Sequence, residues 1–237
     1  MQKTWRVPNM WDGGDAWILG GGPSLLENFS IPKKVEEEVR DRKQKLSAYS
    51  PYLAALHDKH VIGINVAYQL GTWLDMCFFG DKDIYLAHDA ELSQWAKLRV
   101  TSDSYSASRA SYLKYLPKEE RKDRPIGKRN LGISTRADRV CWNWNSGAAA
   151  ISIAAWTGAK RIILVGFDMN LSKANQQHFH NVYKQKDTEQ IRSTFETHLQ
   201  GFSFIRKDAD AMNIEIINTS LNSAITDFPK VHIKELL

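Results

Sequence analysis

Residues 145–169, NSGAAAISIAAWTGAKRIILVGFDM, decide the fold predicted for this chain. A run of small and apolar residues at 148–157 leads through Gly158 into the β-branched run 161–166. A helix that stops at a glycine and feeds a β-branched strand is half of a β-α-β unit, and such units build parallel sheets. The sequence therefore predicts an α/β fold.

Further short apolar runs predict the other strands of the sheet. They lie at 16–20, 61–65, 75–81, 98–101 and 214–218. Helical patterns lie between them: two pieces separated by Pro51 within 32–59, one helix over 188–209 and a short one over 220–228. We expect a Rossmann-like, mostly parallel sheet flanked by helices, with residues 1–237 forming one domain and the irregular residues 89–144 serving as a lid or acceptor-binding insertion.

Composition narrows the class of protein. The chain has 237 residues, of which 43% are hydrophobic and 25% charged, and no apolar run reaches the 18 to 20 residues, roughly, that a membrane span needs. Its start shows no secretory signal pattern, so we expect a soluble protein of the cytoplasm, or of the host cell's cytoplasm if a phage encodes it. Cys77 and Cys141 lack metal or redox spacing and are expected to be buried thiols.

The net charge of +5 is modest, and acidic residues are interspersed with basic ones. The most basic stretch, residues 118–139, is followed by Trp142 and Trp144. It reads as a solvated loop, with a surface for nucleic acid or an acidic substrate as the alternative.

The turn GGGPSL at 20–25 follows the first predicted strand and opens a helix. Glycines let the backbone approach a phosphate, and a helix N-terminus offers N–H groups and a positive dipole end. The spacing matches neither the dinucleotide fingerprint nor the P-loop. The segment therefore predicts a phosphate-binding turn, with a structural tight turn as the alternative. Its candidate nucleotide-binding residues are Gly20, Gly21, Gly22, Pro23 and Ser24.

Other strand ends and a helix start carry further candidates. In doubly wound sheets ligands bind outside the carboxyl ends of strands, where the predicted strands end in Asn65, Asp81 and the pair Gly166 and Asp168. Asn145, Ser146 and Gly147 open the small-residue helix, as a second set of N–H donors or as a simple cap. Asp81 and Asp83 form an Asp-x-Asp that suits Mg²⁺ or Mn²⁺ if a metal is used; otherwise no metal is expected.

His178 and His180 lie in a polar loop after Asp168, with Tyr183 close by. A histidine with a near-neutral pKa suits removal of a proton from an acceptor hydroxyl. These three residues are the candidate catalytic groups.

Taken in order, these motifs resemble one superfamily: the bacterial lipooligosaccharide sialyltransferases, the archaeal hydroxymethyl-dihydropterin diphosphokinases and related phage-encoded proteins. The likeness rests on residues 19–25, 63–68, 145–169, 178–183 and the segment IEIINTSLNSAI near the C-terminus. It implies a nucleotide held by the glycine turn, Asn65, Ser146, Gly147 and Asp168. It also implies a general base at His180 or His178, with Tyr183 contacting phosphate. Gly21 and Asn170 depart from the sialyltransferase pattern, so the donor sugar is not carried over.

Three functions follow as expectations. The first is a glycosyltransferase that moves a sugar from a nucleotide sugar to a hydroxyl acceptor, which could be a modified DNA base of a phage. The second is a Mg²⁺-dependent diphosphokinase that uses ATP on a small hydroxymethyl compound. The third is a nucleotide- or nucleic-acid-binding module without catalysis.

Overall fold

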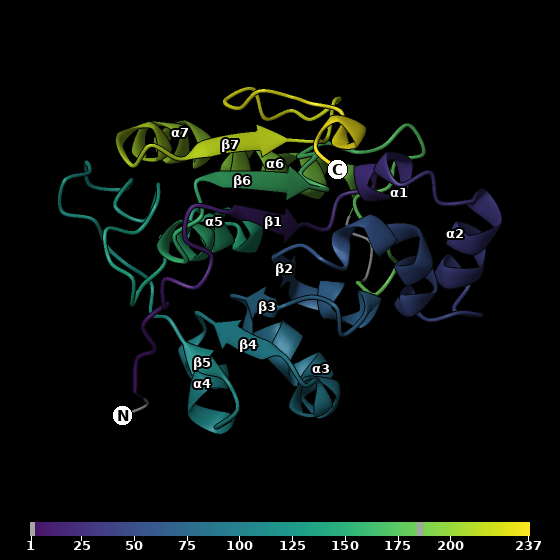
Figure 1. Ribbon diagram of the computed structural model, residues 1–237, viewed down its shortest axis with the longest axis horizontal. Coiled ribbons are helices and arrows are strands. Elements are labelled where there is room, and N and C mark those ends of the chain that lie inside the picture. The colour runs from purple at the N-terminus through teal and green to yellow at the C-terminus, as the bar shows by residue number, and fades with distance from the viewer. Residues whose placement is uncertain (1–2, 184–186) are drawn as a thin grey trace.

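Seven parallel strands form one sheet in the order β5-β4-β3-β2-β1-β6-β7 (Figure 1). The computed structural model describes residues 3–183 and 187–237. The strands are β1 (Asp15–Leu19), β2 (Val61–Ile64), β3 (Met76–Phe79), β4 (Leu98–Thr101), β5 (Lys114–Tyr115), β6 (Arg161–Val165) and β7 (Glu215–Asn218). The parallel sheet expected from residues 145–169 is confirmed.

Helices cover both faces of the sheet. The α-helices are α1 (Ser24–Asn28), α2 (Lys33–Arg40), α3 (Lys82–Gln94), α4 (Ser104–Arg109), α5 (Ser146–Trp156), α6 (Thr188–Leu199) and α7 (Phe202–Ala211). The 3-10 helices are η1 (Leu46–Leu56), η2 (Asn65–Leu70) and η3 (Ile233–Glu235). None of the helices in the described part of the chain has the length and apolar character that crossing a bilayer requires.

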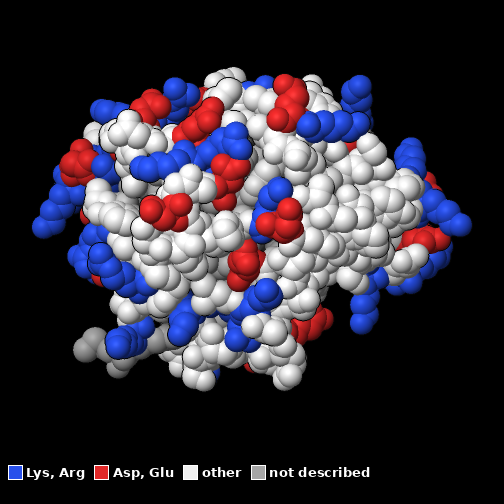
Figure 2. Space-filling view, in the orientation of Figure 1, with Lys and Arg blue, Asp and Glu red and all other residues white. Residues whose placement is uncertain are grey.

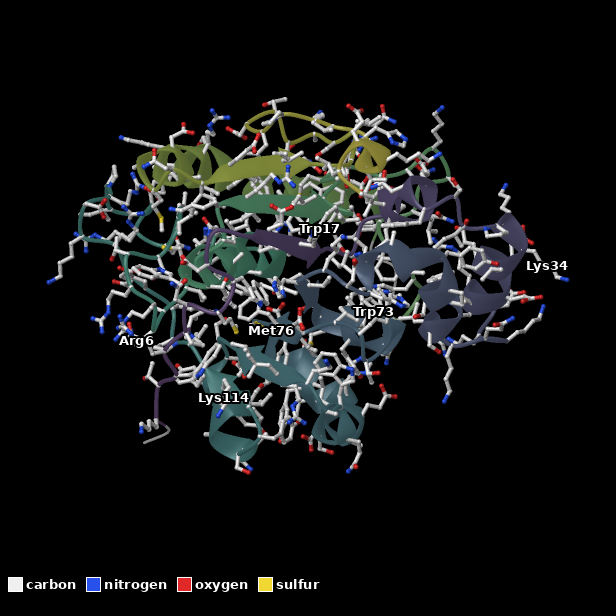
Figure 3. The ribbon with its side chains drawn as sticks, viewed as in Figure 1. Arg6, Trp17, Lys34, Trp73, Met76 and Lys114 are labelled. Atoms are coloured by element: carbon white, nitrogen blue, oxygen red, sulfur yellow. The ribbon has the colours of Figure 1, made fainter. Side chains whose placement is uncertain are left out.

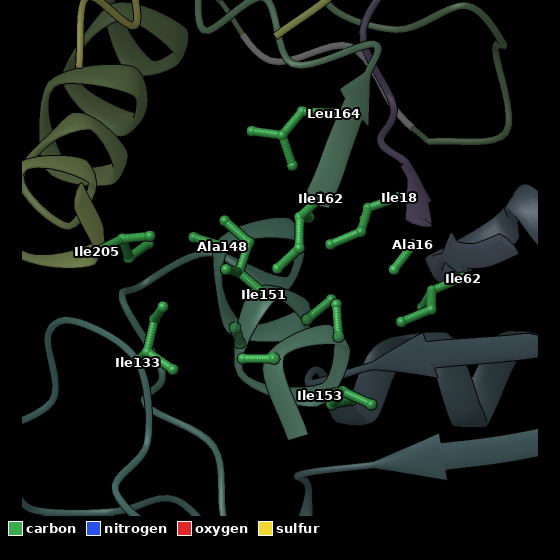
Figure 4. Close-up of a cluster of buried hydrophobic side chains, with 14 of the residues drawn as sticks. Ala16, Ile18, Ile62, Ile133, Ala148, Ile151, Ile153, Ile162, Leu164 and Ile205 are labelled. Atoms are coloured by element: carbon green, nitrogen blue, oxygen red, sulfur yellow. The ribbon is translucent and has the colours of Figure 1, made fainter. Parts of the chain in front are cut away.

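The strands alternate between two apolar cores, because successive side chains point to opposite faces of a sheet. On β1, Ala16 and Ile18 join the core under α5 and α7, which Figure 4 shows. Trp17 and Leu19 join the core under α1, α2, η1, η2 and α3. Figure 3 marks one residue of each core, Trp17 on β1 and Met76 on β3. Since both faces are buried, the strands read as continuous apolar runs.

Helix α5 lies against the centre of the sheet, in contact with β1, β2, β3 and β6. Its first ten residues are all buried, and most of them are alanine, glycine or serine. Small side chains allow a helix to approach a sheet closely. Asn145 caps the helix by accepting a hydrogen bond from the Ala148 N–H at 3.1 Å. The helix ends before Gly158, whose φ of +91° favours glycine.

Three expectations about helices are wrong. The helix expected over 188–209 is two helices, α6 and α7, because the chain turns at Gly201, where a Cβ would stand 2.8 Å from Asn143 Oδ1. Residues 220–228 are not helical, because the Ser220 and Ser223 side chains bond backbone groups of Phe167 instead. Pro51 lies inside η1, so the break in the outer layer falls before η1, between Arg40 and Leu46.

The middle segment is more ordered than its weak sequence pattern indicates. Residues 89–115 contain the end of α3, then β4, α4 and β5, and the strand expected at 98–101 is confirmed. The rest, up to residue 144, is mostly turns and bends and lies to the left of α5 in Figure 1. Asp208 of α7 anchors it, bonding Arg121, Arg124 and the Ile133 N–H.

Candidate functional site

Strand β1 lies at the point where the strand order reverses direction. The chain proceeds from β1 outward to β2, β3, β4 and β5 on one side, and then returns to β6 and β7 on the other. In such sheets the connections leave the β1–β6 junction in opposite directions, which opens a crevice at the carboxyl ends of those two strands. In Figure 1 the arrows of β1 and β6 point toward α1 and α2. The candidate site is at this end.

The turn after β1 packs directly on the end of β6. The Gly22 N–H donates to the Gly166 carbonyl at 2.9 Å. A Cβ at Gly20 would stand 2.7 Å from the same carbonyl, and a Cβ at Gly22 would stand 1.7 Å from Asp168 Oδ2. Gly166 itself has a φ of +72°. Glycine is therefore required at these positions by close packing within the chain.

The Asp168 carboxylate occupies the N-terminal end of α1. Its Oδ2 accepts hydrogen bonds from the Ser24 hydroxyl at 3.0 Å and the Ser24 N–H at 3.4 Å. The Ser24 and Ser220 hydroxyl oxygens are 2.6 Å apart, and Ser220 accepts from the Phe167 N–H at 3.1 Å. Burial raises the pKa of Asp168 to about 6, although the Ser24 bonds act to lower it. An acid group of the chain thus already holds the anion position of this helix.

The N-terminus of α5 supplies a second set of donors. Asn145 caps the helix, and its first backbone bond of the helical type is donated by Ala149. The N–H groups of Ser146 and Gly147 precede that bond and belong to the donors that a helix leaves unsatisfied. The Phe167 ring packs against Gly147, where a Cβ would meet it at 2.9 Å. This packing brings the start of α5 to the end of β6.

Asn65 and Tyr183 meet at the end of β2. Asn65 has a φ of +55°, a left-handed conformation that asparagine adopts more readily than most other non-glycine residues. Its Oδ1 and the Tyr183 hydroxyl are both buried, and neither has a hydrogen-bond partner of good geometry among the described residues. Burial raises the pKa of the Tyr183 hydroxyl, while the Val66 N–H and the Asn65 side chain act to lower it.

The loop after β6 stacks its two histidines over the glycine turn. The His178 and His180 rings are parallel, with centroids 5.1 Å apart, and the Tyr183 ring meets both at its edge. His178 Nδ1 would stand 3.0 Å from a Cβ at Gly21, and Phe179 donates its N–H to the Gly21 carbonyl at 2.9 Å. This geometry places both histidines beside the phosphate-binding turn that the sequence predicts.

The two histidines differ in their access to solvent. His180 is 5% exposed, and burial first, then the charges of His178, Arg40 and His88, lower its pKa well below 6.5. Its Nδ1 accepts the Val182 N–H at 3.3 Å, which assigns the proton of the neutral ring to Nε2. His178 is half-buried. Of the two, only His178 combines partial exposure with contact to the glycine turn.

Asp81 lies at the end of β3 and reaches α5. It is exposed, yet the surrounding protein still raises the pKa of its carboxyl, while Lys118 and a hydrogen bond from the Ser146 side chain lower it. Asp83 lies two residues further, in the first turn of α3, and is exposed. Within residues 3–183 and 187–237, no three His, Cys, Asp or Glu side chains gather closely enough to hold a metal ion.

The structure thus brings together the strand-end and loop residues that the sequence singles out. The sequence analysis missed three residues. Ser220 completes the cluster around Asp168. The Arg40 guanidinium donates to the His178 carbonyl at 2.9 Å, and the Arg40 carbonyl accepts from the Asn181 side chain. Lys118 approaches Asp81 and Trp142. Ser220 lies directly beyond the strand ending in Asn218, a signal that the strand-end rule could have used; no local pattern identifies Arg40.

The charge on one face of the molecule and two surface hollows of the described residues can be compared with the position of the strand ends. The face in Figure 2 mixes lysine and arginine with aspartate and glutamate and shows no field of a single sign. Two shallow surface hollows, of about 590 and 530 Å³, are lined by parts of 187–194 and by parts of 119–123 and 135–139. Neither includes a strand-end residue. Cys77 and Cys141 are buried free thiols, as expected.

No family model matches the chain, and no curated protein matches it. Among solved structures, it is similar to the MAf glycosyltransferase from Magnetospirillum magneticum AMB-1, with a TM-score of 0.57 and 12% identity over 99% of this chain and 36% of that one. It is also similar to the sialyltransferase CstII from Campylobacter jejuni in complex with the substrate analogue CMP-3FNeuAc, with a TM-score of 0.49 and 16% identity over 92% and 86% of the two chains. The chain spans about a third of the first protein's length. At these identities the likeness shows the fold alone.

Proposed function

We propose that this protein is a glycosyltransferase that moves a sugar from a nucleotide sugar to a hydroxyl acceptor. One observation carries the proposal: a partly exposed histidine, His178, lies against the glycine turn of β1 at the point where the sheet reverses direction. A base beside a phosphate-binding turn suits transfer from a phosphate leaving group to a hydroxyl. The similarity in fold to a glycosyltransferase agrees with it.

In this proposal the nucleotide lies across the ends of β1 and β6. Gly20, Gly21 and Gly22, with Pro23, form one wall, and their lack of side chains lets this wall pack closely on the end of β6 and on His178. Since Asp168 fills the N-terminus of α1, the phosphates take the N–H groups of Ser146 and Gly147 at the start of α5. Asn145 caps the start of α5. Gly166 and Asp168 support the glycine turn, and the Ser24 hydroxyl holds the Asp168 carboxylate in place.

Asn65 and Tyr183 complete the leaving-group side. Their buried oxygen atoms have no partner of good geometry in the described structure, and unpaired buried polar atoms are costly. A donor molecule that bonds the Asn65 carboxamide or the Tyr183 hydroxyl would remove that cost. The Tyr183 hydroxyl stays protonated at neutral pH and can donate to a phosphate oxygen.

His178 serves as the general base. It removes the proton from the acceptor hydroxyl as that oxygen bonds to the anomeric carbon, and the bond from that carbon to the phosphate oxygen breaks with its electron pair remaining on the nucleotide. His180, which is neutral and buried, stacks on His178 and fixes the plane of its ring. His180 is therefore a positioning residue.

Release of nucleotide from a panel of nucleotide sugars, measured by chromatography with either EDTA or Mg²⁺ present, tests the proposal. We expect one donor to be consumed slowly with water as acceptor, and His178→Gln to abolish that turnover while leaving donor binding intact. ATP consumption that needs Mg²⁺ and a hydroxymethyl acceptor would identify a diphosphokinase instead. Equal turnover with and without His178 would exclude its role as the base.

A further inference from the structure

Asp81 holds the N-cap position of α3 but does not cap the helix. Asp103, Asn145 and Asp187 hold the same position in α4, α5 and α6, and each accepts a hydrogen bond from the N–H three residues onward. The Asp81 side chain makes no such bond. It lies instead beside the Ser146 hydroxyl, at the start of α5. The carboxylate is therefore directed toward the candidate site rather than used for its own helix.

An aromatic ring and a lysine adjoin this carboxylate. The Trp142 ring lies on Gly80, the residue before Asp81, where a Cβ would stand only 2.0 Å from the ring. Lys118 Nζ is 3.9 Å from the Trp142 ring centroid, and its charge also acts on Asp81. Both Asp81 and Lys118 are exposed, and Trp142 is half-buried. A carboxylate, an ammonium and an aromatic ring thus border one place on the surface.

A buried hydroxyl without a partner points to the same place. Ser102, at the end of β4, is 3% exposed, and its hydroxyl has no hydrogen-bond partner among the described residues. It would stand 3.0 Å from a Cβ at Gly80, in the gap that the Trp142 ring fills. Buried hydroxyls in folded proteins usually have a partner. The missing partner indicates that this spot is shaped for something other than stability.

The charge around the cluster favours a neutral ligand. Besides burial and Lys118, the carboxylates of Asp83 and Asp103 affect Asp81, and both raise its pKa. Three carboxylates outnumber the ammonium groups of Lys118 and Lys82, and this disfavours a polyanion such as nucleic acid. They accept hydrogen bonds from sugar hydroxyls, and Lys118 donates to them.

We propose that Asp81, Lys118 and Trp142 form the acceptor subsite, and that it takes a neutral pyranoside. Hydroxyls of the pyranoside bond to Asp81 and Lys118, and the Trp142 ring, which lies against Gly80 and under the Lys118 ammonium, holds Lys118 in place. This places the acceptor beside Ser146, next to the phosphates of the donor. The inference rests on the proposed function for its part in a reaction, but pyranoside binding itself needs no donor.

Saturation-transfer NMR with a panel of uncharged methyl pyranosides, without nucleotide, measures that binding. We expect at least one pyranoside to bind, and Asp81→Asn and Lys118→Gln each to weaken it about tenfold or more, since each removes a hydrogen bond to a charged group. Asp58→Asn, an exposed aspartate that pairs only with Lys59 at the surface, is the matched control and should bind as the native protein does.

Several outcomes would overturn the inference: no pyranoside binds at 10 mM, roughly the weakest affinity worth assigning to a site, or the Asp81 and Lys118 variants bind like the control. Binding of a single-stranded oligonucleotide that depends on Asp81 and Lys118 would overturn it in favour of nucleic acid. Failure of the proposed function is separate, because it appears as an absence of nucleotide-sugar turnover while pyranoside binding persists.

Discussion

At the ends of β1 and β6 the chain pairs its own polar groups, whereas at the ends of β2 and β4 some buried oxygens have no partner of good geometry among residues 3–183 and 187–237. The first region, the closed half, comprises the turns 20–24 and 166–168 with Ser220, where serine hydroxyls and backbone groups bond Asp168 and each other. The second, the open half, comprises Asn65, Ser102 and Tyr183. Under the proposed function, the closed half serves as a wall of the site and the open half contacts the ligand.

The largest effect is expected from the residue that faces both halves. His178→Gln should reduce sugar transfer roughly 10²- to 10⁴-fold, because a general base contributes about that much. Nucleotide affinity should stay within about twofold, since the donor contacts lie on other residues. Steady-state kinetics and calorimetric titration separate the two quantities. His57→Gln, an exposed histidine bonded to the Ser50 carbonyl, is the control. A turnover loss in both variants alike would contradict the assignment.

The closed half should not tolerate a methyl group. Gly22→Ala places a Cβ 1.7 Å from Asp168 Oδ2, and we expect the free energy of unfolding to fall by about 3 kcal/mol. At about 2 to 4 °C per kcal/mol for a chain of this size, the melting temperature drops by about 6 to 12 °C. Gly14→Ala, whose Cβ would meet only the Trp11 carbonyl at 3.4 Å, is the matched control. Equal stability of the two variants would show that the turn is loosely packed.

Much of the fold and the position of the glycine turn could be predicted from the sequence, because glycines and strand-end polar residues are local signals. The runs at 16–20, 61–65, 161–166 and 214–218 identified strands of the sheet, and the glycine turn was located correctly. Which half keeps unpaired atoms could not be predicted, since it depends on contacts between distant segments. Ser220 meets Ser24 across 196 positions, and Arg40 meets His178 across 138.

The wrong helix predictions over 188–209 and 220–228 also come from contacts between distant segments. Residues 220–228 have an acceptable helical pattern, but the Ser220 and Ser223 hydroxyls bond the end of β6, and that tertiary contact outweighs local propensity. Gly201 interrupts residues 188–209 because the helix there packs on Asn143. The partners of these contacts, Phe167 and Asn143, lie more than 50 residues away in the sequence, so the local pattern could not identify them.

The buried Asp168 in the closed half should make the free energy of unfolding depend on pH. Burial raises the Asp168 pKa from about 3.8 to about 6, so between these values the folded protein binds more protons than the unfolded chain. The Asp168 contribution to stability is therefore lost as pH rises from about 4 to 6. Asp168→Asn removes this titration. The stability of the variant relative to the native protein should therefore be higher at pH 7 than at pH 4, by on the order of 2 kcal/mol. Urea unfolding of both proteins at several pH values measures the difference. A difference that does not change with pH would mean that Asp168 is not buried as an acid.

The smallest expected effects compare one hydroxyl from each half. Ser220→Ala leaves the Phe167 N–H without its acceptor and should reduce stability by about 1 to 2 kcal/mol. Tyr183→Phe removes a hydroxyl that has no partner of good geometry in the described part of the chain, so stability should stay the same or rise slightly, while nucleotide affinity falls about tenfold. Thermal unfolding and calorimetric titration of the pair test this. Destabilisation by Tyr183→Phe as large as that by Ser220→Ala would erase the distinction between the halves.

Thermal unfolding of the unmodified protein with a panel of nucleotides and nucleotide sugars, each with EDTA and with Mg²⁺, tests the central claim most directly. A ligand at a hundred times its Kd adds about 2.7 kcal/mol, which raises the melting temperature by about 5 to 11 °C here. The proposed function predicts such a rise for at least one nucleotide sugar in EDTA. A melting temperature that no nucleotide changes, with or without Mg²⁺, would contradict it.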